Sequence, residues 1–177
     1  MYLERKRTMS ISFGLLVVRV VVGLLLAGHG AQKLFGWFGG HGFTGTTGFL
    51  KSVGFKPAGF WALLGSLGEF AGGLLLALGF LSPLGAIAIF ASMLMAVFKF
   101  HWTKGLWSTN GGFEYPLVLL LLSLVLGFVG PGSYSLDALF GIALPTALFW
   151  LGIVASIIID VVGIVTSRQT EHAQSAA

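Results

Sequence analysis

The sequence predicts an all-α membrane protein, an antiparallel four-helix transmembrane bundle with a fifth, carboxy-terminal transmembrane helix. Apolar residues make up 56% of the 177 residues and charged residues only 9%, whereas about a quarter of the residues in a soluble domain are charged. The apolar residues form long runs separated by short stretches rich in Gly, Pro and Ser, and a helix needs roughly 20 mostly apolar residues to cross a bilayer. We therefore expect one membrane domain whose main partner is the lipid bilayer.

The charge and the lack of cysteine exclude several classes of function. The net charge is +4, and its one cluster, Arg5-Lys6-Arg7, is typical of the flank of a first transmembrane helix, so no nucleic acid is expected to bind. A chain without cysteine cannot exchange disulfides, hold an iron–sulfur cluster or use a cysteine nucleophile. No flavin, nicotinamide or haem motif is visible, so redox chemistry would need a bound group and a partner that supplies electrons.

The first transmembrane helix is expected over residues 11–35, after a basic tail formed by residues 1–10. A cleaved signal peptide also has a basic start, but this run is longer, contains Arg19 and His29, and is followed by further apolar segments. Residues 36–59 are rich in Gly, Thr and aromatic side chains. They are too broken for a spanning helix and too apolar for a solvated loop, so we expect them at the membrane interface.

Three further helices complete the predicted core, residues 11–137. The segments 60–80 and 84–100 are joined by a tight turn at Ser82-Pro83, which makes them antiparallel neighbours. A fourth helix is predicted over residues 115–129, with Pro116 in its first turn.

Residues 138–165 hold an additional hydrophobic helix, and residues 166–177 a polar tail. Basic residues flank both sides of the predicted bundle. Since the first helix usually sets the orientation, we expect a cytoplasmic amino terminus.

Ionisable residues inside the apolar runs are the candidate functional residues, because a charge at the bilayer centre costs at least about 2.5 kcal/mol. Arg19 and Glu69, counted inward from the same membrane face, fall at a comparable depth. We therefore expect an Arg19–Glu69 ion pair that faces the bundle interior beside Gly68 and Gly72. Two interpretations stay open: a pair that fixes helix register, and a proton relay.

A second polar group is expected at the opposite membrane face. Alternating helix direction brings its members to one leaflet: His29, Lys33, Lys99, His101 and Glu114. His29 and Lys33 are four residues apart and share a helix face. The two lysines could instead extend to the lipid headgroups, and the tryptophans at this level are typical interface anchors.

This group suits a quinone, which needs an apolar slot and polar groups at headgroup depth for its carbonyl oxygens. His29, His101 and Glu114 could bind those oxygens. A histidine and a buried carboxylate can also exchange the two protons that accompany quinone chemistry. A metal site is the alternative, since two histidines and a glutamate are plausible ligands, but no metal-binding spacing such as HExxH supports it.

Four short blocks carry a family resemblance: HGAQKLFG at residues 29–36, GE at 68–69, NGGFEYP at 110–116 and GPGSYSLD at 130–137. Their order and spacing resemble the DoxX family over roughly residues 11–137. The resemblance implies a multi-pass protein of a prokaryotic cell membrane. Members are described as small subunits of quinol oxidase or thiosulfate:quinone oxidoreductase, as oxidoreductases linked to catechol and quinone stress, or as membrane partners of thiol and superoxide-detoxifying enzymes.

The family's recurrent polar positions map onto Arg19, His29, Lys33, Glu69, Asn110 and Glu114. We predict an oxidoreductase-like membrane module that binds quinone or quinol near one membrane face and works with a soluble or membrane redox partner. The predicted catalytic residues are His29, Glu69 and Glu114, and the predicted cofactor-binding residues are Arg19, His29, Lys33, His101, Asn110 and Glu114.

Two other functions stay open. A non-catalytic scaffold for soluble redox-detoxifying enzymes would use residues 36–59 or the tail for its contacts. A small-molecule or proton transporter would use the intramembrane charges as an ion path, although the chain shows no inverted repeat with paired broken helices. A homo-oligomer in the membrane plane is the default expectation.

Overall fold

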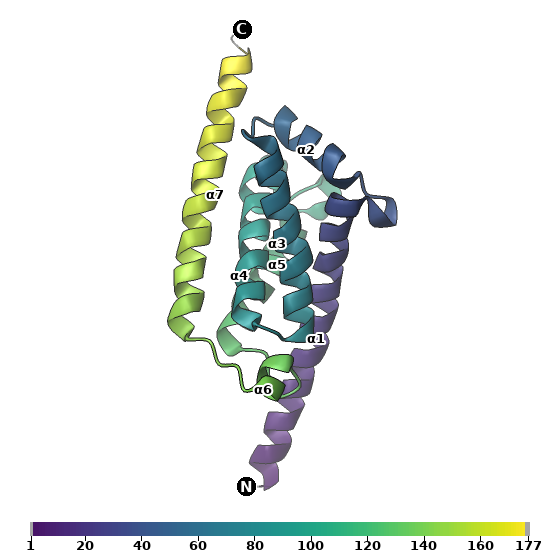
Figure 1. Cartoon of the computed structure of the whole chain (residues 1–177), viewed down its shortest axis with the longest axis vertical. Helices are drawn as coiled ribbons and strands as arrows, with labels where there is room; N and C mark the ends of the chain where they lie inside the picture. Colours follow the sequence, from purple (N-terminus) through teal and green to yellow (C-terminus); the bar gives the residue numbers. More distant parts are fainter. Residues whose placement is uncertain (1, 176–177) are drawn as a thin grey trace.

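Helices make up most of residues 2–175, the part of the chain that the computed structural model describes; side chains are described for Arg7 and residues 9–170. Five long helices carry the fold (Figure 1): α1 (Tyr2–Phe35), α3 (Ala58–Leu78), α4 (Ser82–Met95), α5 (Glu114–Val129) and α7 (Thr146–Ser175). Two shorter helices, α2 (Gly42–Ser52) and α6 (Leu136–Phe140), lie in the connections. The described residues form no strand.

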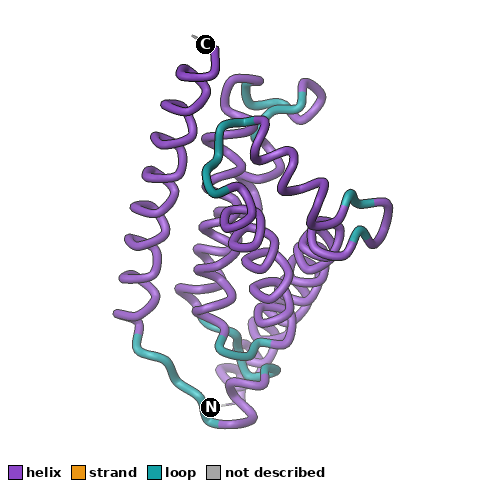
Figure 2. Tube along the Cα trace, turned by 45° about the horizontal axis from the view of Figure 1, so that its top comes forward, coloured by secondary structure: helices purple, strands orange, loops and turns teal. Residues whose placement is uncertain are grey.

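The long helices alternate in direction, which gives the bundle two distinct ends (Figure 1). The amino-terminal end holds the start of α1, the turn between α3 and α4, and α6. The opposite end, called the α2 end below, holds α2 and the loop between α4 and α5. Loops gather at these two ends (Figure 2), as a membrane requires, because unpaired backbone groups are costly in hydrocarbon.

Four helical stretches are long and apolar enough to cross a membrane: Met9–Phe35, Ala58–Leu78, Ser82–Lys104 and Thr146–Thr170. Helix α5 is a shorter apolar helix, and its 16 residues extend over about 24 Å at the α-helical rise per residue. The predicted fold class, an all-α membrane bundle with an additional carboxy-terminal apolar helix, is confirmed.

Glycines set the register between α1 and α3, which pack closely together. A Cβ atom added to Gly23 would lie 2.5 Å from the Gly73 carbonyl oxygen, and one added to Gly73 would lie 2.5 Å from the Gly23 oxygen. About two turns further along α1, towards the α2 end, Gly30 packs directly on the backbone of Phe70. Such small-residue contacts let membrane helices approach closely, and here they leave no room for the helices to slide.

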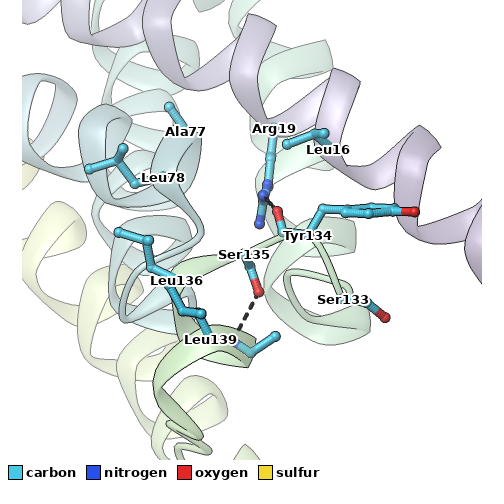
Figure 3. Close-up of a pocket in the computed structure, with 10 residues that line it drawn as sticks. Leu16, Arg19, Ala77, Leu78, Ser133, Tyr134, Ser135, Leu136 and Leu139 are labelled. Atoms are coloured by element: carbon cyan, nitrogen blue, oxygen red, sulfur yellow. Dashed lines mark hydrogen bonds between the residues drawn. The ribbon is translucent and has the colours of Figure 1, made fainter.

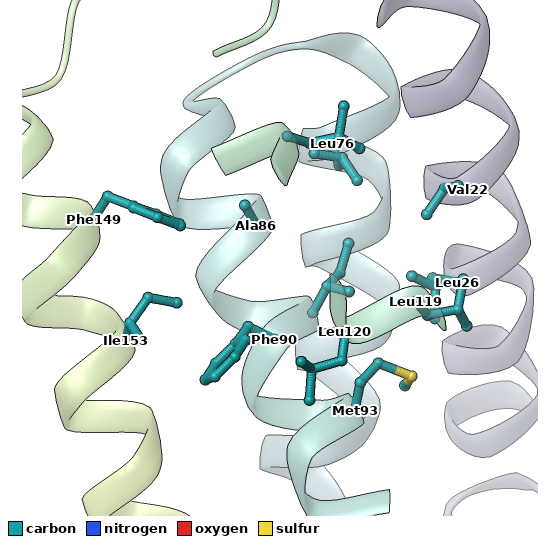
Figure 4. Close-up of a cluster of buried hydrophobic side chains, with 12 residues drawn as sticks. Val22, Leu26, Leu76, Ala86, Phe90, Met93, Leu119, Leu120, Phe149 and Ile153 are labelled. Carbon is teal, nitrogen blue, oxygen red and sulfur yellow. The ribbon is translucent and has the colours of Figure 1, made fainter. Parts of the chain in front are cut away.

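The apolar core lies where α1, α3, α4, α5 and α7 meet (Figure 4). It contains Val22, Leu26, Leu76, Ala86, Ile89, Phe90, Met93, Leu119, Leu120, Leu126, Phe149 and Ile153. Helix α7 packs mainly against α4. The face of α7 towards the bundle also carries buried polar side chains, Ser156, Asp160 and Ser167, each at most 5% exposed.

Three segments contain more helix than the sequence predicted. Helix α1 begins at Tyr2 rather than at residue 11, because no proline or glycine interrupts the chain before Gly14. Residues 36–59 contain a surface helix, α2, which packs on α1 and α3 and crosses the end of the bundle (Figure 1). Helix α4 continues through a π-helical segment, Ala96–His101, and a 3-10 turn, Trp102–Lys104; further 3-10 turns are Trp37–Gly39 and Ser108–Asn110.

Candidate functional site

An ion pair at the α2 end joins the last turn of α1 to the middle of α3. Lys33 Nζ lies 2.5 Å from Glu69 Oε1, with 42% of the lysine side chain but only 5% of the glutamate side chain exposed. The second carboxylate oxygen, Oε2, is buried without a hydrogen-bond partner among the described residues. Glu69 can therefore accept one more hydrogen bond from a group that enters the site.

The predicted Arg19–Glu69 ion pair is wrong, and the register of α1 and α3 explains why. Gly23 of α1 faces Gly73 of α3. Arg19 lies about one turn from this contact towards the amino-terminal end. Because the two helices are antiparallel, Glu69 lies about one turn from it towards the α2 end. The two residues are separated by roughly 12 Å along the helix axes. Helix α1 extends past the end of the bundle, so counting from the predicted membrane face misjudged the depth of Arg19.

His29 lies one turn before Lys33 on α1 and reaches across to α5. Its Nδ1 lies 3.1 Å from Gln32 Oε1, and its Nε2 lies 3.4 Å from the hydroxyl of Tyr115. The two rings meet edge to face, with centroids 6.1 Å apart. Tyr115 also interacts electrostatically with Glu69. His29, Lys33, Glu69 and Tyr115 thus form one polar group at the α2 end.

Two members of this neighbourhood were not singled out from the sequence. Gln32 orients His29, and its amide nitrogen donates to the Phe38 carbonyl at 3.2 Å. Tyr115 supplies the contact from α5. Gln32 lies in the block HGAQKLFG next to Lys33, and Tyr115 lies in the block NGGFEYP next to Glu114. This adjacency to predicted site residues was the available signal.

Three other predicted site residues lie in the segment 101–114 rather than in this group: His101, Asn110 and Glu114. The Ser108 amide donates to Glu114 Oε2 at 3.0 Å, and His101 Nδ1 lies 2.7 Å from the Gly111 carbonyl oxygen. Asn110 is exposed in the 3-10 turn between them. These contacts make residues 101–114 an ordered cover at the end of the bundle.

Arg19 lies at the amino-terminal end and is 2% exposed. Its Nη1 donates to the Pro131 carbonyl at 3.0 Å, and its Nη2 donates to the Tyr134 carbonyl (Figure 3). Backbone carbonyls from the connection after α5 thus take the place that the sequence analysis gave to Glu69.

Asp137, which the sequence analysis did not assign, organises the same end. Its Oδ1 accepts from the Leu81 amide at 2.7 Å, and its Oδ2 accepts from the amide and the hydroxyl of Ser82 at 2.9 and 2.7 Å. The carboxylate therefore caps the amino terminus of α4, where a negative charge is favourable.

These features define a small, multi-pass α-helical membrane protein with a buried charged group near each end of its bundle. The chain belongs to the DoxX family, whose model matches residues 14–102. A curated relative, inner membrane protein YqjF of Escherichia coli (strain K12), is 31% identical over 126 residues, which cover 71% of this chain and 91% of the relative. No solved structure matches the chain.

The family and its apolar helices make the chain a multi-pass protein of a prokaryotic cell membrane. Arg19, His29, Lys33, Glu69 and His101 fall within the matched residues, and Asn110 and Glu114 lie beyond them.

Proposed function

We propose that this protein is an oxidoreductase-like membrane module that binds a quinone or quinol at the α2 end and works with a partner redox enzyme. The buried Glu69 carboxylate carries the proposal, because one of its oxygens is paired with Lys33 and the other has no partner among the described residues. A buried polar atom left unpaired is costly, so a ligand hydroxyl that binds there gains an interaction that the free protein lacks.

We propose that such a ligand enters between α1 and α5. Helix α1 packs extensively on α3 but little on α5, and the His29–Tyr115 contact bridges α1 and α5. Tyr115 is 43% exposed and Phe35 51% exposed, so aromatic surface faces the lipid. A flat quinone ring can reach the polar group from the bilayer at this point.

The residues at the α2 end divide into donors and an acceptor. Lys33 Nζ, the His29 ring and the Tyr115 hydroxyl can donate hydrogen bonds to a quinone oxygen, whereas Glu69 Oε2 can accept one from a quinol hydroxyl. Reduction of one quinone consumes two electrons and two protons. The partner supplies the electrons, and His29 and the Lys33–Glu69 pair supply the protons. The loop that covers this end contains His101, Asn110 and Glu114.

The test is a titration of the purified, detergent-solubilised protein with a short-chain quinol, kept reduced and followed by quenching of tryptophan fluorescence. Trp37 follows α1 directly and reports on the α2 end. We expect saturable quenching, weakened at least tenfold, about 1.4 kcal/mol, in His29→Ala and Glu69→Gln. Asp160→Asn, which changes a buried carboxylate on α7, is the control and should bind like the native protein.

Non-saturating quenching that neither substitution changes would rule out this site. Solute uptake by protein-containing liposomes, with no electron donor present, would instead favour the transporter hypothesis.

A further inference from the structure

The amino-terminal end contains an open surface cavity of about 530 Å³, within the size range of small-molecule sites. Its walls come from α1, the end of α3, and the connection that contains α6 (Figure 3). The lining is apolar apart from Arg19 and residues 133–135: it also includes Leu16, Ala77, Leu78, Leu136, Ala138 and Leu139.

Arg19, which lines this cavity, is incompletely satisfied. A guanidinium group has five N–H donors, and the Pro131 and Tyr134 carbonyls accept from two of its nitrogens. The third nitrogen, Nε, is buried without a partner among the described residues. A buried cation in this state lacks a hydrogen bond at one of its three nitrogens.

No carboxylate of the described residues forms a salt bridge with Arg19. The ion pair that they contain is Lys33–Glu69, at the other end of the bundle. Asp137 interacts with Arg19 electrostatically, but both oxygens of Asp137 are already bonded at the amino terminus of α4. An external oxyanion would supply what Arg19 lacks, because charge-assisted hydrogen bonds from arginine to carboxylate or phosphate are strong.

The position of the cavity suits a lipid headgroup. Helix α3 ends at Leu78 and α4 begins at Ser82, so the level of Arg19 is where the hydrophobic bundle ends. Leu139, on the rim, is 72% exposed, which suits contact with acyl chains. Helix α1 continues past this level and carries the basic tripeptide 5–7, and basic residues beside a membrane attract anionic lipids.

We propose that this cavity binds an amphiphilic anion, a phosphate or carboxylate headgroup attached to an acyl chain. The headgroup accepts a hydrogen bond from the Arg19 guanidinium, and the chain lies along Leu16, Leu78 and Leu139. The site is separate from the proposed quinone site, because it lies at the opposite end of the bundle.

The experiment is native mass spectrometry of the full chain, stripped of lipid in a neutral detergent and titrated with three lipids of equal chain length: phosphatidylglycerol, a free fatty acid and phosphatidylcholine. We expect one molecule of an anionic lipid to bind at least tenfold more tightly than phosphatidylcholine. Tighter binding of phosphatidylglycerol identifies a phospholipid as the occupant, and tighter binding of the fatty acid identifies a carboxylate.

Two variants locate the site. Arg19→Gln should remove the preference for anionic lipid. Leu139→Trp fills the cavity from an exposed position on α6 and should weaken binding at least fivefold while the protein stays folded. Lys51→Gln, which removes an exposed lysine on α2, is the control for net charge. Equal binding of the three lipids, or a preference that survives Leu139→Trp or is lost in Lys51→Gln, would overturn the proposal.

Discussion

The two ends of the bundle each hold a basic residue on α1, but they compensate its charge differently. At the α2 end, Lys33 pairs with the Glu69 carboxylate from the neighbouring helix. At the amino-terminal end, Arg19 donates to the backbone carbonyls of Pro131 and Tyr134. The ammonium group of lysine is compact, whereas the planar guanidinium can bond several acceptors at once. Matching charges of opposite sign can therefore identify a partner for Lys33 but not for Arg19, and the predicted Arg19–Glu69 pair was wrong at both ends.

The largest effect is expected from a substitution that changes the register of α1 on α3, because this register keeps Arg19 and Glu69 at opposite ends of the bundle. In Gly73→Leu the new Cβ would lie 2.5 Å from the Gly23 carbonyl oxygen, and because the obstacle is backbone, α1 and α3 must move apart. We expect a loss of about 3 kcal/mol or more in the free energy of unfolding, seen as a lower melting temperature by circular dichroism in detergent.

Gly65→Ala is the matched control on the same helix, since a Cβ there meets nothing within 4 Å. If Gly73→Leu melted like the native protein, close packing of α1 on α3 would not set the register.

The Lys33–Glu69 pair should be asymmetric. Lys33→Met leaves a buried carboxylate without its partner, whereas Glu69→Gln leaves a lysine that is already 42% exposed and can extend to the headgroups. We expect Lys33→Met to lower the free energy of unfolding at neutral pH by roughly 2 kcal/mol more than Glu69→Gln does. The double variant should recover most of the loss, as a double-mutant cycle would measure. Equal effects of the two single changes would contradict the burial difference.

The smallest expected effects come from two separate variants that keep the positive charge, Arg19→Lys and Lys33→Arg. Arg19→Lys keeps the charge but cannot easily bond both carbonyls, so it should lose about 1 to 2 kcal/mol. Lys33→Arg keeps a cation beside Glu69 and should lose less than about 1 kcal/mol. Melting temperatures of the two variants, measured side by side, test the difference. A greater loss for Lys33→Arg would mean that the carbonyl contacts of Arg19 contribute little to stability.

Much of the fold follows from the sequence because the apolar runs are long and their breaks are clear. The tight turn before α4 and Pro116 in α5 mark helix boundaries that the structure shows close to where they were predicted. The placement of His29 and Lys33 at one end was also predictable from helix direction. The start of α1 was not, because a polar tail without a helix breaker gives no boundary signal.

The partners of Glu69 and Arg19 could not be predicted in the same way. The partner of Glu69 depends on the contacts of Gly23 and Gly30 with α3, and a shift of one or two turns would pair other residues. The partners of Arg19 are backbone carbonyls, which every residue has, so no side-chain pattern marks them. The bond between His29 and Tyr115 likewise joins residues that are distant in the sequence.

The buried carboxylate on α7 has a consequence for how the protein is made. Asp160 is 5% exposed because α7 packs with that face towards α4. If α7 were surrounded by lipid alone, a carboxylate near the middle of the helix would cost about 2.5 kcal/mol or more. Helix α7 is long and apolar enough to span a membrane, but docking against α4 shields this carboxylate from lipid. Docking therefore stabilises the inserted helix, which makes α7 part of the folding unit although it lies outside the residues that match the family.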